Sequence, residues 1–358
     1  MVKQNFSSNV LIVLDSYKYV TKENVIRSEL EQFCSPTFFY TDYENKLIRF
    51  FHGIKGIGNF LSHIAYWTAS LFSAIKIFHR MEDHGSKIFI NPLVGIFYCF
   101  LLALLKKNDD VCIAGFLFVE KQNKLYLSWR EKFVNFSYAR ANKIIVYSSN
   151  EVGHYSQRFP LLASKFKFIK YGRDYDIFKE NEYLSNEKYV ASGGSSNRDF
   201  NTLACALDHL EKKKVAVKCK IATRPGADIL QCSPSNLEIL YDIRLDKFGS
   251  FLDKSLFVII PVKNSGVSGG HMALLEAMSR GKLIIVTDIP GVRDYVDEEN
   301  VIFYKPEDSI DLAGKIEYVL TNLNDEFLLE KAENAKKLYF EKYHFCALVN
   351  RLVKEMVA

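Results

Sequence analysis

The sequence lacks any apolar run of the ~18–20 residues that a membrane-spanning helix requires. Residues 1–9 are polar and lack the apolar core of a signal peptide. We therefore expect a cytoplasmic protein. The composition, with 48% hydrophobic and 25% charged residues, is that of a globular protein and excludes a disordered or fibrous one. A length of 358 residues favours two domains, each with its own core.

Metal-binding patterns are also missing. The seven cysteines form no Cys-x-x-Cys pair, and their odd number predicts reduced thiols in a cytosolic chain. His52, His63, His79 and His84 show no metal-ligand spacing. We expect neither a metal site nor a bound cofactor.

Zinc-finger spacing and a tract rich in Lys and Arg are absent, although the net charge is +5. The first 180 residues contain 24 basic and 16 acidic side chains, a net charge of +8, whereas the rest of the chain carries −3. One half should therefore face an anionic partner. Nucleic acid is possible on charge alone, but an anionic membrane surface fits equally well, and we expect no nucleic acid partner.

Short apolar strands alternate with helical stretches along the chain, which predicts parallel sheets of the α/β class. The expected strands are 10–14, 48–51, 87–90, 111–113, 144–147 and 166–169 in the first half, and 189–191, 215–222, 237–240, 257–260, 283–287 and 301–303 in the second. The expected helices are 60–78, 93–105, 129–140, 151–158 with Asn150 as N-cap, 199–210, 306–320, 325–341 and 344–356. A ligand should bind in a cleft at the carboxyl ends of the strands.

The most informative stretch is 257–291. A buried strand at 257–260 is followed by the small-residue loop 265–270 and by a helix from about His271 to the C′ glycine Gly281. A strand, a glycine loop and a helix N-terminus together present free backbone N–H groups to a phosphate. Glu276 could then reach sugar hydroxyls beside that phosphate. The alternative is a plain turn, with Glu276 on the helix surface.

The segment from Ser268 to Val286 resembles the signature of retaining family 4 glycosyltransferases. The matching residues are Gly269-Gly270-His271, Leu274-Leu275-Glu276-Ala277-Met278, Gly281-Lys282 and Ile284-Ile285-Val286-Thr287-Asp288. The segments 165–176, 193–206 and 301–320 are also similar to the family. The resemblance implies the GT-B fold, with two facing Rossmann-like domains and a cleft between them. We expect an acceptor domain at 1–171, a nucleotide-sugar-binding domain at 172–343, and a C-terminal helix, 344–358, that packs back on the first domain.

One position departs from the family motif, which has two glutamates separated by seven residues. The second matches Glu276, to which the resemblance assigns the donor ribose, but the first falls on Ser268. Contacts to the donor sugar must then come from other groups, such as the backbone N–H groups of 268–271 or the carboxylate of Asp288. The resulting candidates for donor binding are Gly193, Gly194, Ile243, Lys263, Ser268, Gly269, Gly270, His271, Met272 and Glu276.

Arg198 stands five residues after Gly193, where the family usually has a lysine that binds the diphosphate. Its guanidinium can hold phosphate oxygens in a bidentate manner. The usual arginine beside the first glycine is replaced by Gly194, and Arg224 or Lys263 could supply the missing charge. Each cation has a surface alternative, which for Arg198 is pairing with Asp199. We expect Arg198, Arg224 and Asp288 to be catalytic, and the backbone of Ile243 to contact the base.

The first half of the sequence contains fewer candidate functional motifs. The loop 53–58 lacks the Gly-x-Gly-x-x-Gly order of a dinucleotide site, so we favour a structural turn. The stretch 93–105 is apolar on all faces and precedes Lys106 and Lys107, which favours a core helix over a membrane element. Aromatic residues of 50–78 alternate with Lys55, Lys76 and Arg80, which is compatible with docking at an anionic membrane.

The resemblance predicts a glycosyltransferase that moves a sugar from a nucleotide-diphosphate donor, a UDP- or GDP-sugar, with retention at the anomeric carbon. The acceptor would be a glycan or a lipid-linked sugar in the synthesis of a surface polysaccharide or glycoconjugate, at the inner face of the cell membrane. Two alternatives stay open. They are a GT-B nucleotide-sugar 2-epimerase and a non-catalytic GT-B-like subunit of a partner enzyme.

Overall fold

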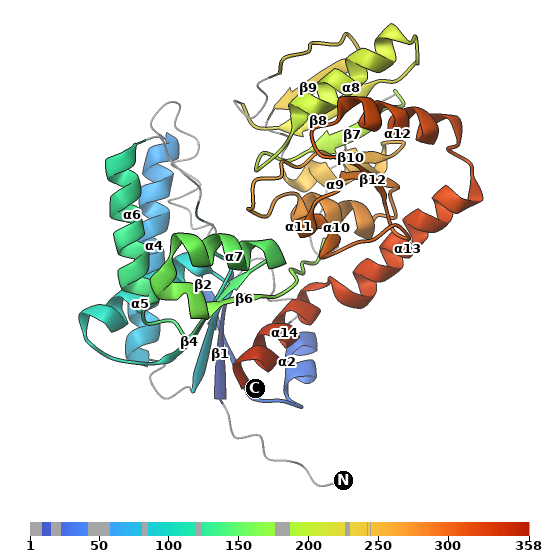
Figure 1. The fold of residues 1–358 in the computed structure, drawn as a ribbon. Coiled ribbons are helices and arrows are strands. Elements are labelled where there is room, and N and C mark those ends of the chain that lie inside the picture. The colour runs from blue at the N-terminus through green and yellow to red at the C-terminus, as the bar shows by residue number, and fades with distance from the viewer. Residues whose placement is uncertain are drawn as a thin grey trace. The chain divides into compact units, whose positions relative to one another are not determined.

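The computed structural model describes residues 9–15, 23–41, 58–80, 85–116, 118, 123–175, 187–225, 230–241, 243 and 245–357. The chain divides into two compact units (Figure 1). The first unit comprises Met1–Tyr147, Val152–Ile169 and Leu348–Ala358, and the second comprises Ser148–Glu151 and Lys170–Ala347.

The described strands of the first unit form a six-stranded, fully parallel sheet in the order β2-β1-β3-β4-β5-β6. They are β1 (Asn9–Asp15), β2 (Ser35–Thr41), β3 (Ser86–Phe89), β4 (Asp110–Ala114), β5 (Lys143–Val146) and β6 (Phe166–Phe168). The centre of β1 is fully buried, as expected for a strand covered on both faces.

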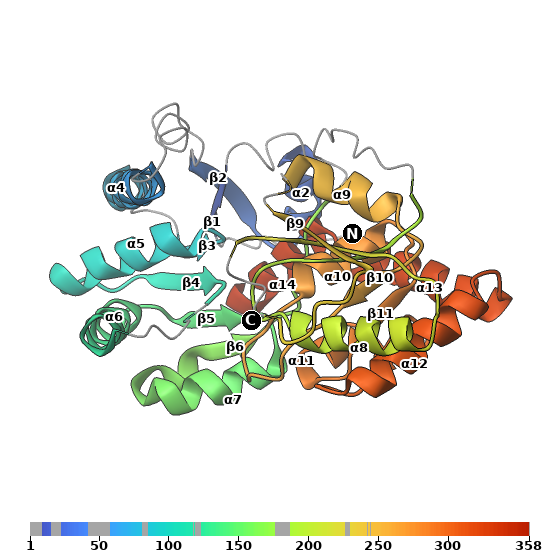
Figure 2. The same cartoon turned by 90° about the horizontal axis from the view of Figure 1, so that it is seen from above.

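Helices cover both faces of this sheet. They are α2 (Glu23–Leu30), α4 (Gly58–Arg80), α5 (Pro92–Leu104), α6 (Lys124–Tyr138), α7 (Ser149–Arg158) and the 3₁₀ helix η2 (Pro160–Lys165). The connections through α4, α5 and α6 step across the sheet in one direction, so right-handed crossovers place these helices on one face. Figure 2 shows them there, with α2 on the opposite face beside α14 (Phe345–Val357).

The second unit repeats this architecture, with its described strands in the parallel order β12-β11-β10-β7-β8-β9. The strands are β7 (Val190–Gly193), β8 (Cys219–Thr223), β9 (Leu237–Tyr241), β10 (Val258–Ile260), β11 (Ile284–Thr287) and β12 (Ile302–Tyr304). Two α/β units with parallel six-stranded sheets confirm the predicted fold class.

Two apolar clusters fill the two faces of this second sheet. One contains residues of α8 (Phe200–Lys212) and α12 (Ser309–Thr321), and the other contains residues of α9 (Leu245–Asp253) and α10 (His271–Ser279). The short α11 (Pro290–Arg293) follows β11, and the long α13 (Glu326–Lys342) precedes α14.

The sequence missed several elements for identifiable reasons. Strand β2 was not expected from the sequence; it contains Pro36 and lies at the edge of the sheet, where proline is tolerated. Helix α6 begins at Lys124 because Asn123 caps it, earlier than the expected 129. Asn150 is not an N-cap, because α7 already begins at Ser149. The expected strand 48–51 and most of the loop 53–58 lie outside the described residues.

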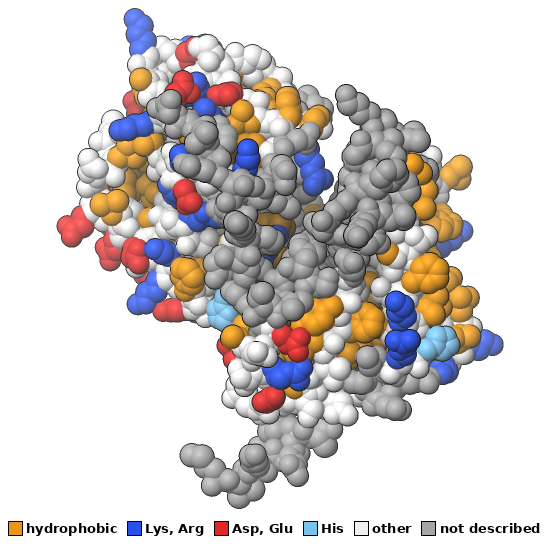
Figure 3. All heavy atoms as spheres, turned by 180° about the vertical axis from the view of Figure 1, so that it is seen from behind, with side chains coloured by type: hydrophobic (Ala, Val, Ile, Leu, Met, Phe, Trp, Pro, Cys, Tyr) orange, Lys and Arg blue, Asp and Glu red, His pale blue; other side chains and the backbone are white. Residues whose placement is uncertain are grey.

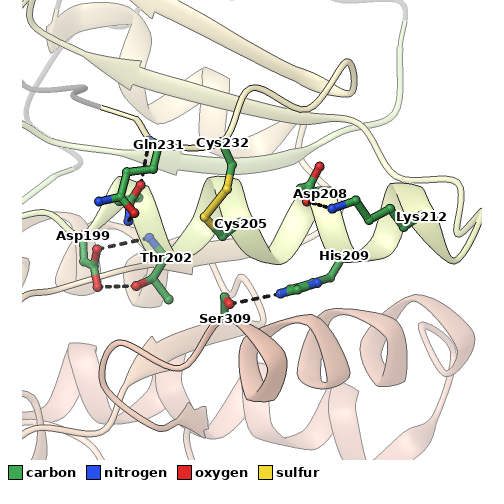
Figure 4. Close-up of a disulfide and its surroundings, with 10 residues drawn as sticks. Asp199, Thr202, Cys205, Asp208, His209, Lys212, Gln231, Cys232 and Ser309 are labelled. Carbon is green, nitrogen blue, oxygen red and sulfur yellow. Dashed lines mark hydrogen bonds and ion pairs between the residues drawn. A yellow bond between two sulfur atoms is a disulfide. The ribbon is translucent and has the colours of Figure 1, made fainter.

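The prediction that all cysteines are reduced is wrong for one pair. Cys205 of α8 and Cys232, which precedes β9, form a disulfide with a Cα–Cα distance of 5.3 Å (Figure 4). Polar contacts hold the same segments together, since Gln231 N donates to Asn201 Oδ1 at 2.8 Å. The five other cysteines are buried free thiols: Cys34, Cys99, Cys112, Cys219 and Cys346. The pairing depends on how the segment around Cys232 packs on α8, which cysteine spacing does not reveal.

We expect removal of this disulfide to destabilise the second unit. The bond joins residues 27 apart in the sequence, and the loss of such a cross-link costs about 3 kcal/mol in the chain-entropy model. Urea unfolding should show this loss in a Cys205→Ser, Cys232→Ser variant and in reduced wild type. Alkylation of the denatured, unreduced wild-type protein should label five thiols. Labelling of all seven would contradict the assignment.

Candidate functional site

The second sheet reverses its winding direction between β7 and β10. The chain leaves β7 towards β8 and leaves β10 towards β11, on opposite sides of this central pair. In open α/β sheets, ligands bind outside the carboxyl ends of the strands at such a switch point. Two loops meet at this place in the structure, residues 194–199 after β7 and residues 261–270 after β10. These two loops form the candidate site.

Glycines allow the two loops to approach each other closely. Gly194 has φ +104° and Gly270, the N-cap of α10, has φ +82°, both in the region that favours glycine. A Cβ atom on Gly269 would lie 2.8 Å from the Cβ of Asn197. The glycine loop therefore lies on the 194–199 loop with its backbone exposed at the N-terminus of α10, where backbone N–H groups favour an anion.

Arg198 lies beneath this loop and is only 8% exposed. Its Nε donates to Gly193 O at 2.8 Å, while a Cβ atom on Gly270 would lie 2.9 Å from its Nη1. Among the described residues no carboxylate pairs with it, and the buried Nη1 has no hydrogen-bond partner. Burial lowers its pKa to about 10, so it stays charged at neutral pH. A buried cation without a counterion is costly unless an anion completes its shell.

The alternative of an exposed Arg198–Asp199 pair is therefore wrong. Asp199 instead caps α8, because its Oδ1 accepts from Thr202 N at 3.2 Å and its Oδ2 from Thr202 Oγ1 at 2.6 Å. Its backbone N donates to Pro261 O at 3.1 Å. Asp199 thus fixes the start of α8 and leaves the guanidinium available to the glycine loop.

Asn197, which the sequence analysis did not single out, joins the two loops. Its Nδ2 donates to Lys263 O at 3.1 Å and to Val267 O at 3.0 Å, and its Oδ1 accepts from Ser265 Oγ at 2.9 Å. Its φ of +54° is left-handed, a conformation that asparagine tolerates better than most residues. The sequence does contain an indication of this role, because Asn197 directly follows the small-residue loop Gly193-Gly194-Ser195-Ser196.

Ser268, the position without the motif's first glutamate, is held by a carboxylate from elsewhere in the chain. Its backbone N donates to Glu151 Oε1 at 2.8 Å, and Glu151 is 1% exposed. Within the second unit, Ser149 N and Oγ also donate to Asp294, at 2.8 and 2.7 Å. A small hollow lies between residues 263–269 on one side and residues 148, 150 and 289–291 on the other.

His271, the first residue of α10, is a buried neutral side chain. Its Nε2 donates to Gly291 O at 3.0 Å, and its ring lies 4.5 Å from the Tyr295 ring. Burial lowers its pKa to about 4. It connects the N-terminus of α10 to α11, and so holds the glycine loop against the far wall of the hollow.

We expect His271 to make the fold sensitive to mild acid. Its folded-state pKa is lowered, so its contribution to stability is complete above the ordinary value of about 6.5 and is lost as the pH falls towards 4. Between pH 7 and 4.5 the unfolding free energy should fall about 2 kcal/mol further in wild type than in His271→Gln, which keeps a donor for Gly291. The exposed His63→Gln is the control. Equal acid sensitivity of wild type and His271→Gln would contradict this role.

Glu276 and Met272 lie on α10 beyond the glycine loop. Glu276 is half-buried, and its Oε1 lies 3.7 Å from Arg280 Nη2, one turn further along the helix. It is therefore not a fully solvated surface residue. Met272 is 47% exposed, and its carbonyl accepts from the Tyr175 hydroxyl at 2.7 Å.

The remaining candidates for catalysis and donor binding make no contact with Arg198 among the described interactions. Arg224 is exposed just after β8, and Lys263 is exposed on the wall of the hollow. Ile243 is half-buried and packs against the apolar core of the second unit. Its two neighbours in the sequence lie outside the described residues. Asp288 directly follows β11, and Arg293 binds both its carboxylate oxygens, at 2.5 and 2.9 Å, and holds its pKa below the usual range.

Among the described residues, no cluster of His, Cys, Asp and Glu has the composition of a metal site. What the site offers is one buried guanidinium, the N-terminus of α10 and an adjacent carboxylate, Glu276. This set suits a ligand with an anionic group and neighbouring hydroxyls.

Comparison with known proteins gives one family match. Residues 189–322, which lie in the second unit, match the family described as glycosyl transferases group 1. No curated protein sequence matches the chain.

Solved structures show the same fold over nearly the whole chain. A glycosyltransferase from Rickettsia africae ESF-5 has a TM-score of 0.58 and 14% identity, covering 98% of this chain and 99% of its own. A sucrose-phosphate synthase from Thermosynechococcus elongatus has a TM-score of 0.60 and 12% identity, and Anabaena Alr3699/HepE in complex with UDP has 0.58 and 12%, with the same two coverages. The fold is therefore GT-B.

Proposed function

We propose that this chain is a retaining glycosyltransferase that uses a nucleotide-diphosphate sugar, a UDP- or GDP-sugar, as donor. The observation that carries the proposal is Arg198, a buried guanidinium without a carboxylate partner among the described residues, placed under a glycine loop at a helix N-terminus. A diphosphate is an anion of the size and charge that this arrangement suits. The group 1 match of residues 189–322 and the UDP complex of the Anabaena neighbour support the same donor class.

In this proposal the diphosphate binds Arg198 and the N–H groups at the start of α10, and the ribose hydroxyls bind Glu276. When the bond from the anomeric carbon to the diphosphate breaks, negative charge accumulates on the leaving group. Arg198 and the helix N-terminus stabilise that charge, with Arg224 or Lys263 as a second cation. The acceptor hydroxyl attacks from the face that the diphosphate leaves, which gives retention.

The proposed division of labour places the donor on 172–343 and the acceptor on 1–171. The acceptor is a glycan or a lipid-linked sugar, in the synthesis of a surface polysaccharide or glycoconjugate on the cytoplasmic side of the membrane. The excess of cations in the first half supports an acceptor presented at an anionic surface.

The absence of the motif's first glutamate keeps two other functions testable. An epimerase would convert the donor into its epimer with no acceptor present. A non-catalytic subunit would bind a partner enzyme and turn over no nucleotide-sugar. Incubation of the protein with UDP- and GDP-sugars, with and without acceptor, followed by separation of the products, distinguishes the three functions.

Replacement of Arg198 should weaken binding of the diphosphate specifically. We expect Arg198→Ala to raise the calorimetric Kd of UDP or GDP by tenfold or more, since hydrogen bonds to charged groups contribute about 1.5–3 kcal/mol. Binding of uridine or guanosine, which lack phosphate, should change little, and Arg198→Lys should retain part of the affinity.

Arg158→Ala is the matched control, because Arg158 is also largely buried but pairs with Glu131 at 2.7 Å. Unchanged affinity for UDP and GDP in a folded Arg198→Ala protein would remove Arg198 from the site. Absence of binding by wild type to either diphosphate would overturn the proposed donor.

Glu276 should contribute through the ribose rather than the phosphate. Glu276→Ala should weaken nucleotide binding by about 1–3 kcal/mol. The loss should disappear for a 2′,3′-dideoxy nucleotide, which lacks the proposed partners, and Glu333→Ala on the exposed side of α13 should have no effect. An equal loss with the normal and dideoxy nucleotides would assign Glu276 a structural role.

A further inference from the structure

Helix α5 of the first unit has an apolar outer face. None of its thirteen residues is charged, which the sequence analysis took as the mark of a core helix. Only Val94, Gly95, Tyr98, Cys99 and Leu102 are buried, however. The opposite side of α5, with Phe97 and Phe100, is half-exposed between α4 and α6. Helix α5 is thus part of the core, as expected, but one of its faces is not fully buried.

Aromatic rings connect this face across three helices. Trp67 of α4 contacts Phe97 of α5 edge-on, with ring centroids 6.0 Å apart, and Phe97 lies 6.5 Å from Phe133 of α6. Phe133 also stacks on Trp129 at 5.6 Å and lies 5.4 Å from Phe100. The contacts form one continuous surface, which we call the aromatic face.

Large apolar side chains of the same three helices, and of the aromatic face itself, are exposed to solvent. On α6 they recur at the spacing of one helix side, with Leu125 85%, Trp129 53% and Phe136 47% exposed. On α4, Phe72 is 64% exposed, and at the end of α5 Leu104 is 54% exposed. Contiguous exposed apolar surface of this kind marks a binding surface.

Apart from Glu131, the charged side chains of helices α4, α5 and α6 themselves are basic. Helix α4 contains no acidic residue, and the only acidic residue of α6, Glu131, pairs with Arg158 at 2.7 Å. Exposed cations lie on α4 and α6 or directly after α5: Lys76, Arg80, Lys106, Lys107, Lys124 and Lys132. Figure 3, seen from behind, shows hydrophobic and basic side chains next to each other on the side where α4 lies.

The combination of exposed aromatic side chains and cations distinguishes between two binding partners, a second copy of the chain and a lipid surface. A second copy of the chain would bring the same cations against each other, which disfavours a symmetric dimer through this face. An anionic lipid surface offers negative headgroups to the lysines and an interfacial layer in which Trp and other amphipathic aromatic side chains are favoured. No described helix is long and apolar enough to cross a bilayer.

We propose that the aromatic face is the surface by which this protein binds anionic lipid bilayers peripherally. The proposal goes beyond the proposed glycosyl transfer and does not depend on it. It also corrects the location expected from the sequence, because the centre of the face is α5 and α6 rather than residues 50–78 alone. Lys55 lies outside the described residues, whereas Lys76 and Arg80 border the face.

The chain contains a direct reporter of this contact. Its only two tryptophans, Trp67 and Trp129, both lie on the aromatic face. We expect their emission to shift to shorter wavelength, and to be quenched by brominated lipid, when wild type is mixed with vesicles of phosphatidylcholine and phosphatidylglycerol at low salt. Vesicles of phosphatidylcholine alone should produce much smaller changes, and salt should reverse the binding.

Co-sedimentation with the same vesicles measures the contributions of the two kinds of side chain. The triple variant Lys76→Glu, Lys124→Glu, Lys132→Glu should bind at least tenfold more weakly, since each cation near an anionic leaflet strengthens binding about fivefold. The triple variant Phe72→Ser, Leu104→Ser, Leu125→Ser, which leaves both tryptophans in place, should lose binding to a similar extent. Two matched triple variants of the second unit should bind as wild type does. The charge control is Lys254→Glu, Lys305→Glu, Lys337→Glu. The apolar control is Ile310→Ser, Phe327→Ser, Leu329→Ser.

Wild type that stays in the supernatant with anionic vesicles at low salt would overturn the proposal. So would an equal loss in the control variants, or a concentration-dependent dimer that the apolar variant abolishes while vesicle binding is unaffected. Thermal unfolding of the same samples, followed by circular dichroism, verifies that the variants are folded. Calorimetric UDP binding on these samples separates failure of the lipid proposal from failure of the donor proposal.

Discussion

The site at the switch point depends on the burial of one guanidinium. Arg198 is enclosed by the backbones at Gly193, Gly194 and Gly270, and a side chain on either of the last two would occupy its place. The chain therefore needs glycine at both positions. It also needs a residue that caps α8 without pairing with Arg198, and a loop that covers the cation without neutralising it. Asp199 and the loop 261–270 meet the last two requirements. Such an arrangement is costly for an empty protein and favourable for one that binds an anion.

The other contacts of the site serve to keep these two loops in register. Asn197 ties the loop after β7 to the loop after β10, and His271 ties the start of α10 to Gly291. Glu151 takes a further backbone N–H of the glycine loop at Ser268. The carboxylate that the family motif places in the loop itself is thus absent, while one from a distant part of the sequence holds the same loop from outside.

The sequence was sufficient for the fold class, because most of the buried parallel strands are short apolar runs bounded by polar turns. It was also sufficient for the glycine loop and for Gly281, whose φ of +63° ends α10 as expected. It was insufficient where a residue's role depends on its tertiary neighbours. Arg198 next to Asp199 suggested a local ion pair, whereas burial separates their roles. Cys205 pairs with Cys232 and Glu151 with Ser268 only because distant segments pack together.

The two units use positive charge in physically different ways. In the second unit the guanidinium of Arg198 is buried, so its interaction with an anion is strong, directional and little screened by salt. In the first unit the cations around the aromatic face are exposed lysines and an arginine, each of which interacts weakly and is screened at physiological ionic strength. A buried cation selects a ligand by geometry, whereas dispersed exposed cations beside aromatic rings bind an extended surface reversibly. Both arrangements of cations contribute to the net charge, so the net charge alone cannot distinguish them.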